Sequence, residues 1–580
     1  MLTWVQYTDR KSRRRKPTAH LSYDQGLHLI KSFLRYASHH TIEDLQAFTS
    51  QWVPHPIWTR VESVPIHDQH VKRAAAVVIA QLSSAGVEQV GGATWWQWRK
   101  KGSPLKADWI EMKSDYNARE SKQEKCRRVM LYIHGGAYFF GSVDEHRYQL
   151  QRHARKLQAR VFAPRYRLAP QFPFPCGLLD CLAAYMYLLT IHEPNEIILA
   201  GDSAGGGMIL SVLCIIRDQK LAMPAGAVLI SPWVDLTHSF PSLSRTDKLD
   251  YIPAHGFMQK PSRAWPPTNH DELEDLLGLT SRHTESDLLS PEKPPESPHT
   301  NTSALEDLWR SLSDPLQLQV DGEIVIVKDQ VQMYTTNKLI THPLVSPILQ
   351  PTLGGLCPLL IMVGGGELLR DEQVYIAHKA ANPSAYPLPS LYRSNYDPED
   401  KLLHRYKPTP VQLQVWEELC HVTPTLSFTR PAKYMYRAVA QFSAWALSRA
   451  QKRAIVITHD LGGSSSESSS SSSSSEDSED EQPNKRRSYL LDGHIGKAGD
   501  PLPHFQNHMI RHQVDRHGNT SNLPPVDELP AMTMSHELIG TVKEGPIRRW
   551  MAAKQEWDKK YSSHRRAVHK LRVEAHTARH

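Results

Sequence analysis

The chain has 580 residues, of which 68 are Lys or Arg and 61 are Asp or Glu, and its formal net charge is +7. This length exceeds one ordinary domain, so we expect one large domain with appended segments. The charge is too modest to indicate a nucleic-acid partner, and no apolar run approaches the roughly 18 residues of a membrane span.

The cysteines and the N-terminus bear on the compartment. Six cysteines lie far apart in apolar surroundings and without C-x-x-C spacing, which predicts reduced core thiols and a reducing compartment. The first 16 residues are polar and basic and contain no apolar signal core. We therefore predict an intracellular, cytoplasmic protein, with peripheral contact to a membrane or lipid droplet as an open alternative.

Residues 1–115 are predicted to form a basic segment, from Arg10 to Lys16, followed by a helical cap. Ser22 to Ala47 and Val71 to Leu82 carry apolar residues at helical spacing. Two aromatic runs, 93–98 and 108–112, are expected to pair as strands.

From Arg127 onward, strand and helix patterns alternate. This predicts an α/β fold with a mainly parallel sheet flanked by helices. The buried strand 129–133 ends in His134-Gly135-Gly136-Ala137, where glycines after a strand expose consecutive backbone N–H groups. Such groups are what an oxyanion hole requires.

The clearest pattern is the stretch 196–207, in which a short apolar strand stops at Gly201-Asp202-Ser203-Ala204-Gly205 and a buried helix follows at once. Strand, sharp turn and helix are the context of the G-x-S-x-G nucleophile elbow. The pattern alone is short and also fits a plain Gly/Ser turn. A strand ending in H-G-G about 70 residues earlier favours the catalytic interpretation.

Four motifs in register carry a family resemblance. They are H-G-G-A at 134–137, Y-R-L-A-P at 166–170, G-D-S-A-G-G at 201–206 and S-P-W-V-D-L at 231–236. Together they resemble the hormone-sensitive lipase family of α/β-hydrolases, and the wording around 134–148 looks closest to its filamentous-fungal members. The resemblance covers 22–449 apart from an insertion at about 240–330. It implies an α/β-hydrolase fold, a cap over the acyl pocket formed by 22–85, and Tyr138 and Phe139 as wall residues.

The acid and the base follow later in the chain. After the apolar strand 358–364, the resemblance places Glu367 at the family's acid position, where an aspartate is usual; Asp371 is the alternative acid, or else a first-turn carboxylate of the next helix. His421 follows the strand 411–416, where this fold places its base. The oxyanion hole is expected from Gly135, Gly136, Ala137 and Ala204, with His134, Gly201, Asp202 and Gly205 in supporting positions.

The C-terminal part differs in composition. We predict a catalytic domain at 116–450, a disordered Ser/acid-rich linker at 451–484 and a basic tail at 485–580. His504, His508 and His512 recur at helical spacing, which fits a metal site less well than a solvated helix or coil. A basic amphipathic helix from Pro546 is predicted either to contact an anionic membrane surface or an acidic partner, or to dock on the body.

These features predict a serine carboxylesterase or lipase that acts on lipid-like esters through Ser203, His421 and Glu367 and needs no cofactor and no metal. The alternative is a receptor-like homologue that binds a small ligand and catalyses nothing. We expect such a homologue to lack the catalytic histidine, whereas His421 is present.

Overall fold

The computed structural model describes residues 22–244, 247–254, 260–266, 316–457 and 495–578. In this part of the chain, eleven strands form one sheet in the order β1-β2-β4-β3-β5-β6-β9-β10-β12-β13-β11. The strands from β4 to β12 run parallel, and antiparallel pairs close both edges. The predicted α/β class with a mainly parallel sheet is confirmed. The strand bounds are β1 Thr59–Ile66, β2 Leu105–Met112, β3 Val129–Ile133, β4 Arg160–Pro164, β5 Ile197–Asp202, β6 Gly226–Ile230, β9 Leu359–Gly364, β10 Val411–Trp416, β11 Gly496–Lys497, β12 Met509–Val514 and β13 Asn519–Asn522.

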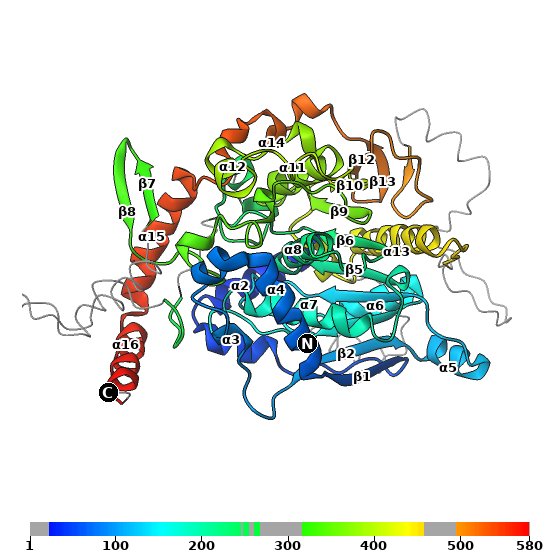
Figure 1. Cartoon of the computed structure of the whole chain (residues 1–580), viewed down its shortest axis with the longest axis horizontal. Coiled ribbons are helices and arrows are strands. Elements are labelled where there is room, and N and C mark those ends of the chain that lie inside the picture. Colours follow the sequence, from blue (N-terminus) through cyan, green and yellow to red (C-terminus); the bar gives the residue numbers. More distant parts are fainter. Residues whose placement is uncertain (1–21, 245–246, 255–259, 267–315, 458–494, 579–580) are drawn as a thin grey trace, which may run out of the picture.

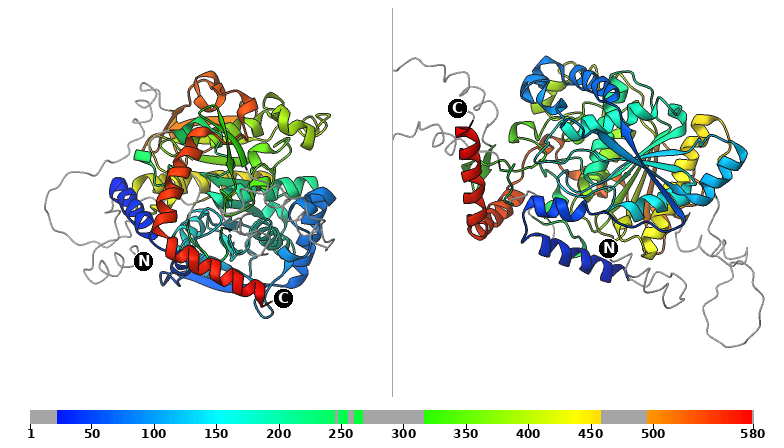
Figure 2. Two further views of the ribbon diagram at one scale, coloured as in Figure 1. Left: turned by 90° about the vertical axis from the view of Figure 1, so that its left-hand side faces the viewer. Right: turned by 90° about the horizontal axis from the view of Figure 1, so that it is seen from below.

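Helices cover both faces of the sheet (Figures 1 and 2). Successive strand residues point to opposite faces, so each buried strand supplies two cores. Leu131, Leu199 and Ile361 belong to the first core, and Met130, Ile198 and Leu360 belong to the second. The first core includes α4 Asp68–Gln89, α7 Cys176–Leu188, α8 Ala204–Asp218 and α11 Arg370–Ala381, and the second includes α2 Tyr23–Ala37, α6 Arg147–Leu157 and α13 Arg430–Gln451.

The N-terminal region is partly helical and partly sheet. Helices α2, α3 (Ile42–Thr49) and α4 agree with the predicted helical segments. The predicted pairing of 93–98 with 108–112 is wrong, because 95–97 form a 3-10 turn and β2 pairs instead with β1. Both strands of 1–115 thus join the main sheet.

The described part of the C-terminal tail, 495–578, is folded onto the body. β12 pairs in parallel with β10 along six residues, from Met509 beside Val411 to Val514 beside Trp416. Figure 1 shows this segment, in orange and red, along the top and left side of the body. The tail therefore continues the sheet. Residues 458–494, which hold most of the predicted linker, lie outside the described residues.

The predicted amphipathic helix forms as α15 (Glu544–Lys560), followed by α16 (Ser562–Thr577). Ile547 and Trp550 are buried, and they pack with valines of the hairpin β7 (Leu316–Val320) and β8 (Glu323–Val327). Arg549 donates to the carbonyl oxygens of Leu243 and Ala254, 2.6 and 2.9 Å away. Of the two predicted alternatives, the structure shows the helix docked on the body.

The insertion is described only in part, since 267–315 lie outside the described residues. Its described ends form short 3-10 turns, η3 Pro241–Ser244 and η4 Asp247–Leu249, and the hairpin β7–β8. The turns pack beside the segments that follow β9 and β10.

Candidate active site

The turn between β5 and α8 holds Ser203 in a strained backbone conformation, with φ 50° and ψ −123°. A side chain at Gly201 would meet the backbone of Gly205 at 2.7 Å, and one at Gly205 would meet the Ile133 carbonyl oxygen at 2.1 Å. Only glycine fits at these two positions. The strain turns the Ser203 hydroxyl out of the strand, as an elbow requires.

The loop after β3 lies directly against this turn. A Cβ at Gly135 would approach Asp202 Oδ2 to 2.4 Å and Ser203 Cβ to 3.1 Å. Gly136 and Ala137 both adopt positive φ, 110° and 49°. The buried His134 donates Nδ1–H to the Gly135 carbonyl oxygen at 2.8 Å, and its pKa is lowered to about 3 by burial, so the ring is neutral. The structure thus brings the predicted oxyanion loop beside Ser203.

His421 and Glu367 complete a hydrogen-bonded chain from Ser203. His421 Nε2 lies 2.8 Å from Ser203 Oγ, and His421 Nδ1 lies 2.5 Å from Glu367 Oε2. The second carboxylate oxygen, Oε1, accepts from the Gly364 N–H at 2.6 Å. The carboxylate fixes the proton on Nδ1, so Nε2 is left to accept from the serine hydroxyl.

The three groups of this chain are almost completely buried: Ser203 is 9% exposed, His421 4% and Glu367 2%. Burial alone would lower the pKa of His421, but the Glu367 carboxylate, and more weakly Asp250, raise it above its ordinary value. This electrostatic environment favours the imidazolium that forms when the base takes a proton.

Asp202, the variable residue of the elbow, has a supporting place. Its Oδ1 accepts from the Tyr132 hydroxyl at 2.7 Å, and its Oδ2 lies 3.5 Å from His146 Nε2. Burial opposes charge on His146, yet Asp202 raises its pKa to about 9, and the same pair lowers the pKa of Asp202. A buried ion pair therefore lies beneath the elbow.

Asp371, the alternative acid, is placed differently. It lies in the first turn of α11, where Oδ1 accepts from Arg370 at 2.7 and 2.9 Å. Its backbone N–H donates to Ser242 Oγ at 3.2 Å. The structure thus brings Glu367, and not Asp371, to His421.

The three tail histidines do not share a helix face. His504 and His508 are exposed in a loop, in agreement with the predicted solvated coil, whereas His512 lies on β12. Within the described ranges, no three His, Cys, Asp or Glu side chains are grouped so that they could hold a metal ion. The six cysteines are all buried and free of disulfides, as predicted.

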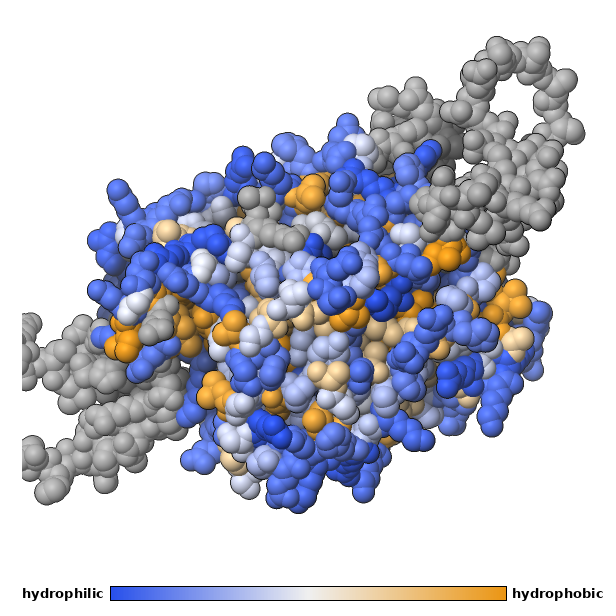
Figure 3. Space-filling view, turned by 90° about the horizontal axis from the view of Figure 1, so that it is seen from above, coloured by the Kyte–Doolittle hydropathy of each residue, from blue (hydrophilic) through white to orange (hydrophobic). Residues whose placement is uncertain are grey.

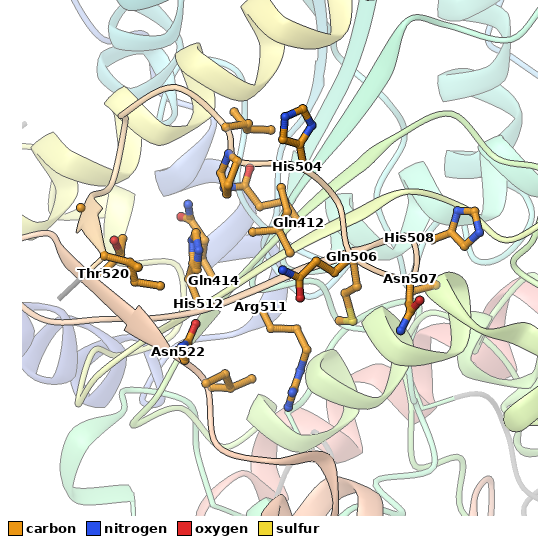
Figure 4. A pocket seen from close by; sticks show the side chains of 18 of the residues that line it. Gln412, Gln414, His504, Gln506, Asn507, His508, Arg511, His512, Thr520 and Asn522 are labelled. Atoms are coloured by element: carbon orange, nitrogen blue, oxygen red, sulfur yellow. The ribbon is translucent and has the colours of Figure 1, made fainter. Parts of the chain in front are cut away.

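A cavity of about 950 Å³ lies elsewhere, between β10, β12 and the loop 495–508 (Figure 4). Its lining includes Gln412 and Gln414 of β10 and Arg511 and His512 of β12. Neither Ser203 nor its two partners belongs to that lining, so this cavity is separate from the hydrogen-bonded chain.

The sequence missed the residues that hold the loop of His421, which we call the base loop (417–423). Three consecutive N–H groups of this loop donate to side chains from other segments: Cys420 to Tyr23 at 2.5 Å, His421 to Asp250 at 3.0 Å and Val422 to Ser231 at 3.1 Å. Ser231 lies in the recognised S-P-W-V-D-L motif. No pattern in the sequence pointed to the other two.

Comparison with known proteins identifies the fold. A family model described as alpha/beta hydrolase fold matches residues 130–265 and 303–385. This match, with the order of the strands, shows that the chain has the α/β-hydrolase fold. An acetyl-hydrolase of Streptomyces hygroscopicus is 44% identical over 110 residues, 19% of this chain and 37% of that protein. Lipase 2 of a Moraxella species is 26% identical over 266 residues, 45% of this chain and 51% of that protein.

A fungal relative, versiconal hemiacetal acetate esterase of Emericella nidulans, is 35% identical over 105 residues, which are 18% of this chain and 37% of that protein. A solved esterase of the bacterial hormone-sensitive lipase family aligns with 73% of this chain and 98% of its own, with TM-score 0.44 and 21% identity. The predicted resemblance to α/β-hydrolases is confirmed by the family model, while the assignment to the hormone-sensitive lipases and the particular closeness to fungal members stay predictions. The chain spans between 37% and 51% of the length of the three curated relatives named here.

Proposed function

We propose that this α/β-hydrolase cleaves carboxylic esters, with Ser203 as nucleophile, His421 as base and Glu367 as the acid that orients it. The observation that carries the proposal is the unbroken hydrogen-bonded chain from Ser203 Oγ through the imidazole to Glu367. A serine, a histidine and a carboxylate in this relation activate a hydroxyl for acyl transfer. Relatives named esterase, acetyl-hydrolase and lipase support the same reaction class.

In the first half-reaction, Ser203 Oγ attacks the ester carbonyl carbon while its proton passes to His421 Nε2. The carbonyl oxygen becomes an oxyanion, and we assign its stabilisation to the N–H groups of Gly136, Ala137 and Ala204 beside the elbow. The intermediate then collapses, the bond to the alcohol oxygen breaks, and His421 returns its proton to that oxygen. An acyl-enzyme and a free alcohol result.

In the second half-reaction, water attacks the acyl carbon and gives a proton to His421 Nε2. Collapse of the new tetrahedral intermediate breaks the bond to Ser203 Oγ, which recovers the proton, and the carboxylic acid leaves. All proton transfers run through one imidazole, and the chemistry consumes only ester and water.

The acyl group is the finer part of the proposal. Aromatic side chains surround the first turn of α8: Tyr138 and Tyr334 stack with ring centres 3.7 Å apart, and Trp233 lies 5.6 Å from Tyr138. A Cβ at Gly207 would come within 3.0 Å of the Tyr138 hydroxyl. This apolar wall supports the predicted role of Tyr138 in binding an acyl chain. The lipid-like substrate remains a proposal, because the relatives' names include both acetyl-hydrolases and a lipase.

Membrane or lipid-droplet contact through the tail helix loses its main support, since the apolar side chains Ile547 and Trp550 are buried against the body. The face that carries much of the tail is mostly hydrophilic, with scattered apolar groups between the hydrophilic residues (Figure 3). Among the described helices, none combines the length and apolar character needed to cross a bilayer. We therefore propose that the protein acts on dissolved esters, and these are the substrates to test before emulsified lipids.

The test is hydrolysis of p-nitrophenyl esters from acetate to decanoate by the full chain, beside Ser203→Ala. We expect turnover by the wild type and a loss of at least about 1,000-fold in the variant. The acyl length with the highest kcat/KM then defines the substrate class. A folded wild type as inactive as Ser203→Ala refutes the hydrolase proposal and leaves ligand binding at this site as the function to pursue.

A further inference from the structure

Asp250, in the described part of the insertion, is a buried carboxylate that accepts hydrogen bonds from two loops of the active site. These loops also contact each other directly, through the Gly366 N–H and the Leu419 carbonyl oxygen at 2.9 Å. Its side chain is fully buried, with 0% exposure. Its Oδ2 accepts from the Leu368 N–H at 2.8 Å, and its Oδ1 accepts from the His421 N–H at 3.0 Å. Leu368 directly follows Glu367, so one carboxylate binds the backbone beside the acid and the backbone of the base.

The segment around Asp250 is wedged between these two loops. Oδ1 also accepts from the Tyr251 N–H at 2.8 Å, which fixes the carboxylate relative to its own backbone. The Tyr251 ring stands edge-on to the His421 imidazole, with ring centres 5.9 Å apart. From the other side, Lys31 of α2 donates to the Lys248 carbonyl oxygen at 3.0 Å.

A second contact from the insertion reaches the same turn. Ser242 Oγ donates to the Leu368 carbonyl oxygen at 2.6 Å and accepts from the Asp371 N–H at 3.2 Å. The turn that carries Glu367 is therefore bound to the insertion at both Leu368 and Asp371. Asp250 extends this connection to His421.

A carboxylate suits this place for a chemical reason. Two buried N–H groups from different loops converge on it, and a carboxylate offers each of them its own oxygen at a fixed separation. An apolar residue would leave both donors unsatisfied. The nearby negative charge also favours the protonated state of His421.

We propose that Asp250 is a positioning residue of the active site, whose carboxylate holds the backbone of the acid turn and of the base loop together and so fixes the Glu367–His421 pair opposite Ser203. The expected effect of Asp250 on the reaction rate rests on the proposed hydrolase function. Asp250 is too deeply buried to touch a substrate, so its effect belongs to kcat and not to KM.

The test compares Asp250→Asn with Asp235→Asn in the full chain. Asp235 is also fully buried, but its carboxylate binds only its own loop, through Thr237 and Ser239. We expect Asp250→Asn to lower kcat on the preferred ester by about ten- to hundredfold, with KM within about twofold of wild type, because a shift of catalytic groups by up to an ångström has this effect. The matched control should keep kcat within about threefold.

A spectroscopic readout makes the test independent of turnover. The Nδ1 proton of His421 lies in a short hydrogen bond to Glu367, so we expect a far-downfield proton resonance in the wild type and in Asp235→Asn that shifts or disappears in Asp250→Asn. An inactive wild type refutes the hydrolase proposal, yet this resonance still tests Asp250.

The proposal is overturned if folded Asp250→Asn keeps kcat within about threefold and retains the resonance, or if Asp235→Asn loses as much activity. Should Asp250→Asn fail to fold, Asp250→Glu keeps the charge but displaces it by one methylene. A tenfold or larger loss of kcat in that variant supports positioning, and wild-type kcat refutes it.

Discussion

The family resemblance leads one to expect an aspartate at position 367. Glu367→Asp keeps a carboxylate there but shortens its side chain, so it tests whether the position of the carboxylate matters as well as its presence. The Glu367 side chain spans two contacts, Oε1 to the Gly364 N–H at 2.6 Å and Oε2 to His421 Nδ1 at 2.5 Å. Aspartate ends about 1.5 Å earlier, one carbon–carbon bond. It can keep at most one of the two contacts at hydrogen-bond distance.

The cost of this change follows from the bond that is lost. A hydrogen bond to a charged group contributes about 1.5–3 kcal/mol, and each 1.36 kcal/mol in an activation barrier is about tenfold in rate. We therefore expect Glu367→Asp to lower kcat by about ten- to hundredfold. Glu367→Gln keeps the shape but cannot accept with both terminal atoms, so the loss should be larger, about 10⁴-fold.

The assay is kcat on the preferred p-nitrophenyl ester, with circular dichroism to show that each variant is folded. Asp371→Asn is the matched control, because Asp371 is equally buried but pairs with Arg370 instead of His421. Its folded form should keep kcat within about threefold. Wild-type kcat in Glu367→Asp, or a larger loss in Asp371→Asn than in either Glu367 variant, would refute the assignment of the acid.

Two further predictions concern pH and stability. Burial lowers the pKa of His421, but the Glu367 carboxylate outweighs burial and raises it. Because the base must be neutral to act, kcat/KM should fall at low pH and reach half its plateau above about pH 6.5. This midpoint should move to lower pH in Glu367→Gln, and a wild-type midpoint below pH 6 would contradict the prediction. Trp550→Ala removes a fully buried ring of α15 and should lower the free energy of unfolding by about 3–5 kcal/mol. The control is Leu571→Ala on α16, where the side chain is 47% exposed, and it should leave the urea midpoint almost unchanged. Equal urea midpoints for the two variants would show that α15 does not dock on the body.

The features that the sequence predicted well are those whose causes lie within a few residues. The elbow is an example, because its two glycines are required by close contacts within the turn and with the adjoining strand. A Cβ would lie 2.7 Å from the nearest backbone atom at Gly201 and 2.1 Å at Gly205. The strand before His134 is a similar case, because a short apolar run that is followed by glycines is typical of a buried strand that ends in a turn. Such patterns suffice to locate Ser203, and family order then suggested Glu367 and His421.

The features that were missed depend on long-range pairing. Met509 to Val514 form β12 beside β10, although the histidines at 504, 508 and 512 suggested a solvated helix or coil. A half-polar strand at the side of a sheet has weak local preference, and its pairing partner decides its conformation. At Trp95 to Gln97 a predicted strand is absent. Aromatic residues favour strands, yet here they form a 3-10 turn.

The base loop shows why the active site cannot be understood from its motifs alone. Val422 adopts φ 41° and Glu418 φ 53°, conformations that residues other than glycine rarely take. Such strain persists only where the surroundings over-determine the backbone. Here Tyr23 of the N-terminal helix and Asp250 of the insertion accept the N–H groups of Cys420 and His421.

Two segments far from the base loop in sequence, helix α2 and the insertion, therefore act directly on the position of the loop that carries the base. In this chain the N-terminal helix and the insertion each supply an acceptor for the backbone of the loop that carries His421, Tyr23 for the Cys420 N–H and Asp250 for the His421 N–H. If the proposed function holds, substitutions there should alter the rate of the chemical step as well as the choice of ester, and the two effects separate as kcat and KM.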